Sequence, residues 1–362
     1  MADERESMSP AGRELAGIVL EAFTRHRLVG IGESHGLQDH HDALQLLLAD
    51  PRLPEVVDDI VVEFGNARYQ DTMDRFIVGR PVADADLRAV WRNTTQSPRQ
   101  TWDAPVYEQF YRTVRAVNWA RPAGRQIRVL LGDPPIDWAA VTDGSGIGAF
   151  LAQRDAHAAS VVEQQVLAKG HRALVCYGAA HLVHPGPGLR VPPSLASIIE
   201  QRTGERMYTI RDLVPSAADP GGLAGQLSRY PRGMVIPAAG TWLGAVDAGL
   251  LFHVIAFGPN RAPVNPFRGV PLGSLLDAGL YLGQTGDLTA SRPNPAIYLD
   301  PAYWEELQRR SALPGGRAVN LDSYRREQPA QYPLPQLPPS LESARPTAPG
   351  ADASRRICRR PV

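Results

Sequence analysis

The chain has 362 residues, of which 43% are hydrophobic, enough to bury a large core in a single α/β domain. Its 38 basic and 38 acidic residues cancel, which argues against a polyanionic partner such as nucleic acid or an anionic membrane surface. Of the two cysteines, Cys176 lies in an apolar run and Cys358 in a polar segment. This placement argues against a disulfide framework and suits a reducing compartment.

The first residues of the chain do not have the pattern of a secretion signal. Acidic and basic residues are mixed through the first fourteen positions, and Glu21 interrupts the apolar stretch that follows. No segment approaches the roughly 18 continuous apolar residues of a membrane helix. We therefore expect a cytoplasmic protein that does not bind a membrane.

Apolar runs that end on polar residues alternate with segments of helical spacing over the first 213 residues. The runs predict five buried strands, at 28–33, 59–65, 126–133, 172–181 and 207–213. Helices are predicted before and between them, at 11–26, 38–49, 67–78, 84–92, 105–120 and 147–169. Because only strands buried on both faces tolerate continuous apolar runs, the fold class is α/β, with a mostly parallel sheet covered by helices.

The rest of the chain is predicted to add two strands to this sheet and to end in a disordered tail. Two apolar runs, at 233–240 and 249–258, are close enough to form a hairpin that extends the sheet. From Gln328 onward the chain is rich in Pro, Ser and Arg and has little to bury, so residues 328–362 are predicted to be a disordered tail. The prediction is one domain over 1–327, with a helical insert at 67–120.

Four of the predicted strands end in ionisable side chains, namely Glu33 with His35, Glu63, Asp133 and His181. The carboxyl ends of parallel strands lie along one edge of a sheet, where ligand crevices form, so these side chains are expected to meet. Glu33 and His35 are two positions apart, so they point the same way if the strand geometry continues. A single charge at a strand end is usually a solvated terminus, but its recurrence on four strands favours a polar site.

Other polar residues have a simpler explanation. The histidines that we expect to be surface or cap-proximal residues rather than ligands are His40, His41, His157, His171 and His184. Arg154 and Asp155 are either an exposed pair on the long helix or carry a guanidinium into the crevice. The chain has no G-x-S-x-G elbow, Walker loop or HExxH motif, and GSGIG at 144–148 does not directly follow a strand, which disfavours serine-hydrolase, ATPase and Rossmann interpretations.

Five short motifs together resemble a known superfamily. They are IGESHG at 31–36, VVEFG at 61–65, LLGD at 130–133, QRDAHAA at 153–159 and YGAAHL at 177–182. They occur in the order seen in the erythromycin esterase-like superfamily, which also includes the ChaN-like haem-uptake proteins and the TraB/Tiki proteins. The resemblance extends over about residues 15 to 285. It implies an α/β core of two similar halves, each contributing one histidine, here His35 and His181.

The branches of this superfamily imply different chemistry. In the erythromycin esterases the position of His35 is thought to activate water, aided by the positions of Glu33 and Glu63. In the Tiki branch the matching His and Glu positions hold a divalent metal, and in the ChaN branch the fold binds haem. Two departures argue against macrolide hydrolysis: Ala158 replaces a Met, and the GAAH stretch has one His where macrolide esterases have two.

The leading hypothesis is hydrolysis of an ester, lactone or amide in a small-molecule substrate, by water activated on His35. Glu33 or Glu63 would orient the imidazole, Arg68 or Arg154 would stabilise the oxyanion, and Asp133 completes the catalytic set.

Two alternatives involve a bound cofactor. In the first, His35, Glu63 and His181 hold Zn²⁺ or Mn²⁺ with a coordination position open for water. In the second, the protein binds haem through Tyr177 or His181 as an axial ligand.

The tail provides a first test. Its composition cannot offset the entropy of ordering it, so truncation after residue 327 is expected to leave the melting temperature unchanged in a thermal unfolding experiment. A drop of more than a few degrees would show that residues 328–362 pack on the core.

Overall fold

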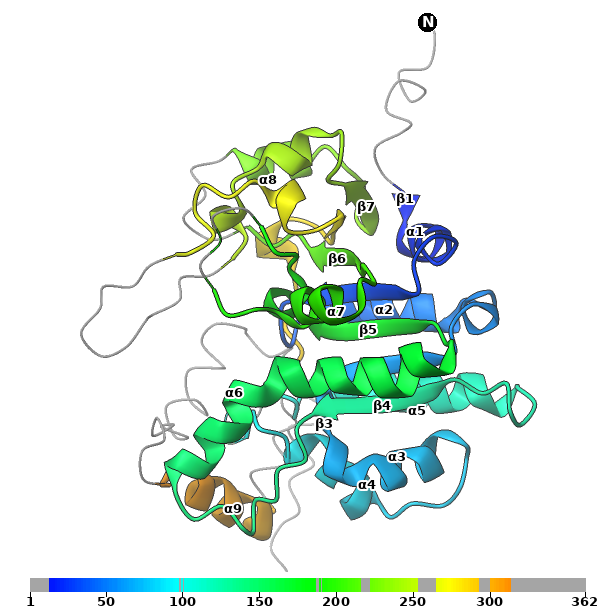
Figure 1. Cartoon of the computed structure of the whole chain (residues 1–362), viewed down its shortest axis with the longest axis vertical. Coiled ribbons are helices and arrows are strands. Elements are labelled where there is room, and N and C mark those ends of the chain that lie inside the picture. Colours follow the sequence, from blue (N-terminus) through cyan, green and yellow to red (C-terminus); the bar gives the residue numbers. More distant parts are fainter. Residues whose placement is uncertain are drawn as a thin grey trace, which may run out of the picture. The chain divides into compact units, whose positions relative to one another are not determined.

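The computed structural model describes residues 13–97, 99, 101–186, 189, 191–215, 222–252, 265–292 and 300–313, which form a helix-covered sheet (Figure 1). Within this part of the chain the sheet has eight strands in the order β1-β7-β8-β6-β2-β5-β3-β4. The strands are β1 (Arg13–Glu14), β2 (Leu28–Glu33), β3 (Asp59–Asn66), β4 (Arg128–Asp133), β5 (Ala173–Gly178), β6 (Tyr208–Asp212), β7 (Met234–Pro237) and β8 (Ala278–Tyr281).

Six neighbouring strands, from β8 through β4, run parallel, and β7 and β1 continue the sheet in antiparallel pairing. The five strands predicted from the apolar runs are β2 to β6. The prediction of an α/β fold with a mostly parallel sheet is confirmed.

Helices cover both faces of the sheet, and the alternation of side chains along each strand separates the two cores. Ile60 and Val62 of β3 pack on one face, with α1 (Leu15–Ala22), α2 (Gln38–Ala49), α3 (Gln70–Ile77), α4 (Asp84–Arg92) and α5 (Pro105–Trp119). Val61 packs on the opposite face, with α6 (Gly144–Val161) and α7 (Leu195–Thr203). In the chain, α3, α4 and α5 lie between β3 and β4, and they form the predicted helical insert.

The remaining helices are α8 (Leu223–Leu227) and α9 (Pro301–Ser311). The predicted helix at 147–169 begins earlier, at Gly144, because the Asp143 carboxylate accepts hydrogen bonds from the backbone of Ser145 and Gly146. It continues past Val161 as one π turn and one 3-10 turn. No helix in the described ranges has both the length and the apolar character needed to cross a membrane.

The predicted hairpin between 233–240 and 249–258 is wrong. Strand β7 does form in the first run, but β8 occupies one of its edges and β1 the other. The described start of the second run forms a 3-10 turn at Ala248–Leu250, and Leu251 and Phe252 pack into a local apolar core. The described part of this run therefore ends in buried residues and pairs with no strand of the described sheet. Residues 253–258, and the predicted tail at 328–362, lie outside the described residues.

Close packing at Gly132 gives a stability test of this sheet. A Cβ on Gly132 would meet the Tyr177 hydroxyl at 1.8 Å. Gly132→Ala is therefore expected to destabilise the fold by about 1–3 kcal/mol through overpacking, measured by urea unfolding. Tyr177→Phe removes the clashing oxygen, which has no hydrogen-bond partner, and should restore part of the loss. Equal stability of the single and double variants would contradict this packing.

Candidate functional site

The carboxyl ends of β2, β3, β4 and β5 lie at one edge of the sheet, as the strand order requires. Glu33 is in register with Gly178 of β5. Ile31 packs in the α2 and α5 core and Val61 in the α6 core, so alternation places Glu33 and Glu63 on opposite faces of the sheet. A group that contacts both carboxylates must therefore reach over the strand ends.

Glu33 is a buried carboxylate surrounded by donors. Its Oε1 atom accepts from His35 Nδ1 at 2.9 Å and its Oε2 from His41 Nε2 at 2.8 Å. The Tyr107 hydroxyl donates to it at 3.3 Å. Burial opposes ionisation, but the hydrogen bonds and charges of the two histidines outweigh it and hold the Glu33 pKa well below its usual range. Because the carboxylate only accepts, His35 must carry a proton on Nδ1.

His35 follows the end of β2, and its ring lies over the backbone of Gly178. A Cβ on Gly178 would meet His35 Cε1 at 2.6 Å, His35 Nε2 at 2.9 Å and Glu63 Oε2 at 3.2 Å. Only glycine leaves room for this ring, and the Nε2 edge of the imidazole lies beside Glu63. Trp102 packs edge-on against the ring, with centroids 4.7 Å apart.

The His35 side chain is 34% exposed, whereas that of its partner Glu33 is only 4% exposed. Burial and the positive charge of His181 lower the pKa of His35. The negative charges of Glu63 and Glu33 raise it, and their effect is larger. The pKa of His35 is therefore raised above 6.5. His35 is thus a solvent-accessible imidazole with one nitrogen fixed and the other free.

Glu63 is buried at the end of β3 and is also saturated with donors. Its Oε2 accepts the Gly178 N–H at 2.7 Å, and its Oε1 accepts the Gln96 side-chain amide at 3.1 Å. The same Oε1 forms an ion pair with the Arg154 guanidinium. Burial raises the pKa of Glu63, but the charges of His181, Arg154 and His35 hold it well below the usual range. Glu63 is therefore a fixed negative charge.

His181 lies between two carboxylates, on the 3-10 turn η6 (Ala179–Leu182) that follows β5. Its Nδ1 donates to Asp155 Oδ1 at 2.6 Å, and its Nε2 is 3.4 Å from Glu63 Oε1. Burial lowers the pKa of His181, but Glu63 and Asp155 outweigh it and raise the pKa to about 10. At neutral pH this group is an imidazolium, a positive charge and a proton donor rather than a base.

Asp133 lies deeper than these groups. It accepts the backbone N–H of Thr95 at 2.7 Å and also the Thr95 hydroxyl, and Arg154 Nε is 3.7 Å away. Burial raises the pKa of Asp133 to about 7, although Arg154 and the Thr95 hydrogen bonds act in the opposite direction. Asp133 thus holds the Thr95 backbone and hydroxyl by hydrogen bonds and lies next to the Arg154 guanidinium.

Arg68 lies outside this cluster, whereas Tyr177 borders it, with its ring edge-on to His181 at a centroid distance of 6.0 Å and its hydroxyl not hydrogen-bonded to any described residue. Arg68 forms an ion pair with Asp137 at 2.9 Å, and its side chain is half exposed. The Tyr177 hydroxyl is buried under Gly132 in the core between β5 and α6. Arg154, by contrast, does carry its guanidinium to the carboxylates, and Asp155 next to it holds His181.

Sequence reasoning missed several contacting residues, namely His41, Thr95, Gln96, Trp102, Tyr107 and Asp155. His40 and His41 lie in the first turn of α2, near the helix start as expected, but both are buried rather than at the surface. Their spacing to Leu44, Leu47 and Leu48 places them on the apolar face of α2, a signal that the sequence did contain. His184, expected at the surface, is also buried, and it bonds Asp277.

The predicted metal ligands His35, Glu63 and His181 do not fit a divalent ion in this arrangement. His181 is an imidazolium whose nitrogens both face carboxylates, and Arg154 and Gln96 already occupy Glu63 Oε1. A metal ligand must offer a free lone pair. Within the described ranges, no three His, Cys, Asp or Glu side chains are grouped so that they could hold a metal ion.

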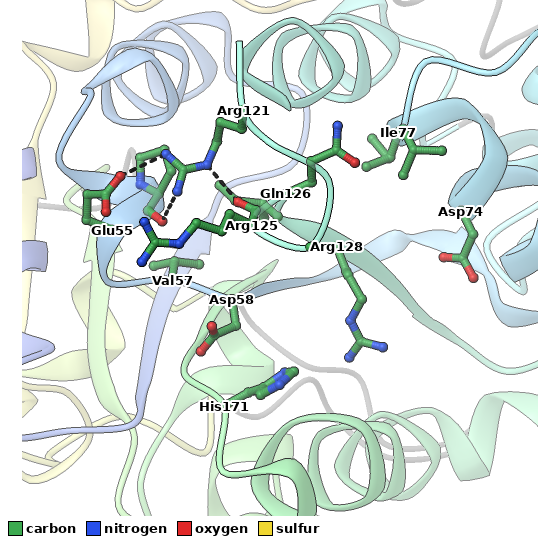
Figure 2. A pocket seen from close by; sticks show the side chains of 14 residues that line it. Glu55, Val57, Asp58, Asp74, Ile77, Arg121, Arg125, Gln126, Arg128 and His171 are labelled. Atoms are coloured by element: carbon green, nitrogen blue, oxygen red, sulfur yellow. Dashed lines mark hydrogen bonds and ion pairs between the residues drawn. The ribbon is translucent and has the colours of Figure 1, made fainter. Parts of the chain in front are cut away.

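A cavity of about 450 Å³ lies at the opposite edge of the sheet, near the amino ends of β3, β4 and β5 (Figure 2). Two of its arginines are already paired within the chain. Arg121 binds Glu55 at 3.0 Å, and Arg128 binds the buried Asp59 at 2.6 Å. The cavity is therefore separate from the polar cluster at the carboxyl edge.

Comparisons with known proteins concern the fold. Searches with family models and of curated proteins find no match to the chain. A Bacillus cereus protein of solved structure matches with a TM-score of 0.53 and 11% identity, over 80% of this chain and 98% of that one. A succinoglycan biosynthesis protein matches with a TM-score of 0.52 and 9% identity, over 81% and 94%. This chain has their fold.

A mutant of erythromycin esterase EreC in its open conformation is also similar, with a TM-score of 0.48 and 12% identity, over 74% of this chain and 93% of that one. ChaN of Campylobacter jejuni, which binds haem cofacially, matches more weakly, with a TM-score of 0.34 and 10% identity, over 56% and 87%. Both are similarities of structure at low sequence identity.

The charge of His181 makes a testable contribution to stability. Its pKa rises from 6.5 to about 10 on folding, so its ion pairs stabilise the fold fully below pH 6.5 and are lost as the pH rises through about 10. We expect the melting temperature of wild type to exceed that of His181→Gln by several degrees near pH 6, and the difference to shrink toward about pH 10. A pH-independent difference would contradict the ion-pair assignment.

Proposed function

We propose that the chain hydrolyses an ester, lactone or amide bond in a small-molecule substrate, with His35 as the general base for water. The observation that carries the proposal is the Glu33–His35 pair. A buried carboxylate fixes Nδ1 at 2.9 Å on a side chain that is 34% exposed, and the ion-paired Arg154 and His181 lie around the neighbouring Glu63. This is the arrangement that general-base catalysis requires.

The surroundings of His35 and His181 give the two imidazoles different pKa values, so one can act as a base while the other stays a cation. His35 is solvent-accessible and titrates above 6.5, whereas His181 keeps its proton up to about pH 10. Arg154 adds a permanent charge beside Glu63. Two titratable groups held at different protonation states can divide the work of base and electrostatic stabiliser.

The chemistry follows from these roles. Neutral His35 takes a proton from water through Nε2, and the hydroxide oxygen bonds to the substrate carbonyl carbon. The resulting oxyanion is stabilised by Arg154 and the His181 imidazolium. When the carbon–oxygen or carbon–nitrogen bond breaks, the proton held on His35 passes to the leaving group, and the base is regenerated.

A protein nucleophile does not suit this site. Cys176 is buried, and burial raises the pKa of its thiol well above the usual range. The hydroxyl of Ser34 donates to Asp212 rather than to a histidine. Direct attack by water needs neither group.

Haem binding is not supported by the residues predicted for it. The Tyr177 oxygen lies under Gly132, where there is no space even for a methyl group. Both nitrogens of His181 face carboxylates. An axial ligand needs an accessible lone pair, which neither side chain offers.

The central test is His35→Ala, assayed on a substrate found by an ester and lactone screen. Loss of the base is expected to lower kcat on the order of 10²–10⁴-fold with little change in melting temperature. His171→Ala is the matched control, because His171 also bonds a buried carboxylate through Nδ1, to Asp59 at 2.8 Å, but lies at the opposite edge of the sheet. Full turnover in His35→Ala would remove the proposed base.

The pH profile gives a second readout of the same pair. His35 must be neutral to act, so kcat/KM should rise with pH through a pKa above 6.5. In Glu33→Gln the lost negative charge lowers the His35 pKa, so this limb should move to lower pH while the maximum rate falls. Activity that depends on added Zn²⁺ or Mn²⁺ and is abolished by a chelator would instead favour the metal hypothesis.

A further inference from the structure

A short stretch of chain between α4 and α5 supplies three side chains that contact the candidate site. We call its described residues, 93–97 and 101–103, the site wall. They are bends and turns rather than a helix or strand, so no regular hydrogen-bond ladder fixes their geometry. The contacts are those of Thr95 with Asp133, Gln96 with Glu63 and Trp102 with His35.

The first end of the site wall is held by a residue of α9. Arg310 is 5% exposed, and its Nη1 donates to the Ser97 hydroxyl at 2.9 Å and to the Arg92 carbonyl at 3.0 Å. Its Nη2 donates to Asn93 Oδ1 at 2.7 Å. One guanidinium therefore ties together three residues on either side of Thr95 and Gln96.

The second end is held by another residue of the same helix. The Tyr303 hydroxyl donates to Asp103 Oδ2 at 2.7 Å, directly after Trp102. The Arg92 guanidinium stacks over the Tyr303 ring at 4.0 Å and lies 3.4 Å from Asp103 Oδ1. Helix α9 thus anchors the site wall both before and after the residues that contact the site.

We propose that Arg310 and Tyr303 are positioning residues: through them α9 braces the site wall and holds Thr95, Gln96 and Trp102 against the catalytic groups. The effect on turnover rests on the proposed function, whereas the brace itself does not. Tyr303 and Arg310 lie more than a hundred residues after His181 in the sequence, so they support the site without belonging to the strand ends that form it. A misplacement of about 1 Å in such supporting groups costs on the order of 10²-fold in rate.

The test compares three variants of the full chain. Arg310→Gln removes the first anchor, and Tyr303→Phe removes only the hydroxyl of the second. Arg309→Gln is the control on the same helix. Arg309 binds the carbonyls of Trp138 and Val141 and shares Glu306 with Arg310, but among the described residues it makes no direct hydrogen bond to the site wall.

Hydrogen exchange at the Thr95 amide measures the brace without any substrate. This N–H is bound to Asp133, so it exchanges only when the wall opens. We expect at least about tenfold faster exchange in Arg310→Gln and a smaller increase in Tyr303→Phe, with amides of β2 and β3 unchanged and Arg309→Gln like wild type. Turnover should fall in kcat more than it changes KM, in the same order of variants.

Each outcome decides a separate point. Unchanged Thr95 exchange in Arg310→Gln, or an equal increase across β2 and β3, would show that α9 contributes only general stability and would overturn the brace. Faster exchange at Thr95 with full kcat would overturn the positioning role. If wild type hydrolyses no ester, lactone or amide, the proposed function fails, and the exchange measurement still decides whether the brace exists.

Discussion

The buried carboxylate of Glu63 is the constraint around which the site is organised. An unpaired charge of this kind costs several kcal/mol when it is removed from water, so the fold must surround it with donors and positive charge. Arg154 and His181 supply charge, and Gly178 and Gln96 supply hydrogen bonds. Each of these partners comes from a different part of the chain. The Glu63 carboxylate therefore connects α6, η6, β5 and the site wall through its hydrogen bonds and ion pairs.

Glu33, on the other face of the sheet, is also a buried carboxylate that needs hydrogen-bond donors, but its donors are of a different kind. Its partners are two histidines and a tyrosine, all of which can donate without a permanent charge. One of them, His35, remains exposed enough to titrate. The sheet thus separates the Glu63 half, where Arg154 and His181 are cationic at neutral pH, from the Glu33 half, where His35 can gain or lose a proton.

Small residues make this contact over the strand ends possible. Gly178 lies directly beneath the His35 ring, and a side chain there would collide with it. Gly132 similarly accommodates the Tyr177 ring beneath the site. Trp102 packs edge-on against the His35 ring. The imidazole is therefore held by packing against Gly178 and Trp102 and by one hydrogen bond to Glu33, which limits its rotation.

The sequence alone indicated the strands, their parallel arrangement and five residues at the carboxyl edge, namely Glu33, His35, Glu63, Asp133 and His181. Apolar runs that end on charges reflect local burial, and the ends of parallel strands must meet at one edge. The sequence could not determine that His181 is an imidazolium or that Asp133 is withdrawn behind Thr95, because a pKa depends on charges brought near by the fold. It also misplaced His41, whose position on the apolar face of α2 was visible but whose buried acceptor, Glu33, was not. The roles of Asp155, Trp102 and α9 were decided only by the tertiary structure, since contacts between residues far apart in sequence leave no periodic pattern along the chain.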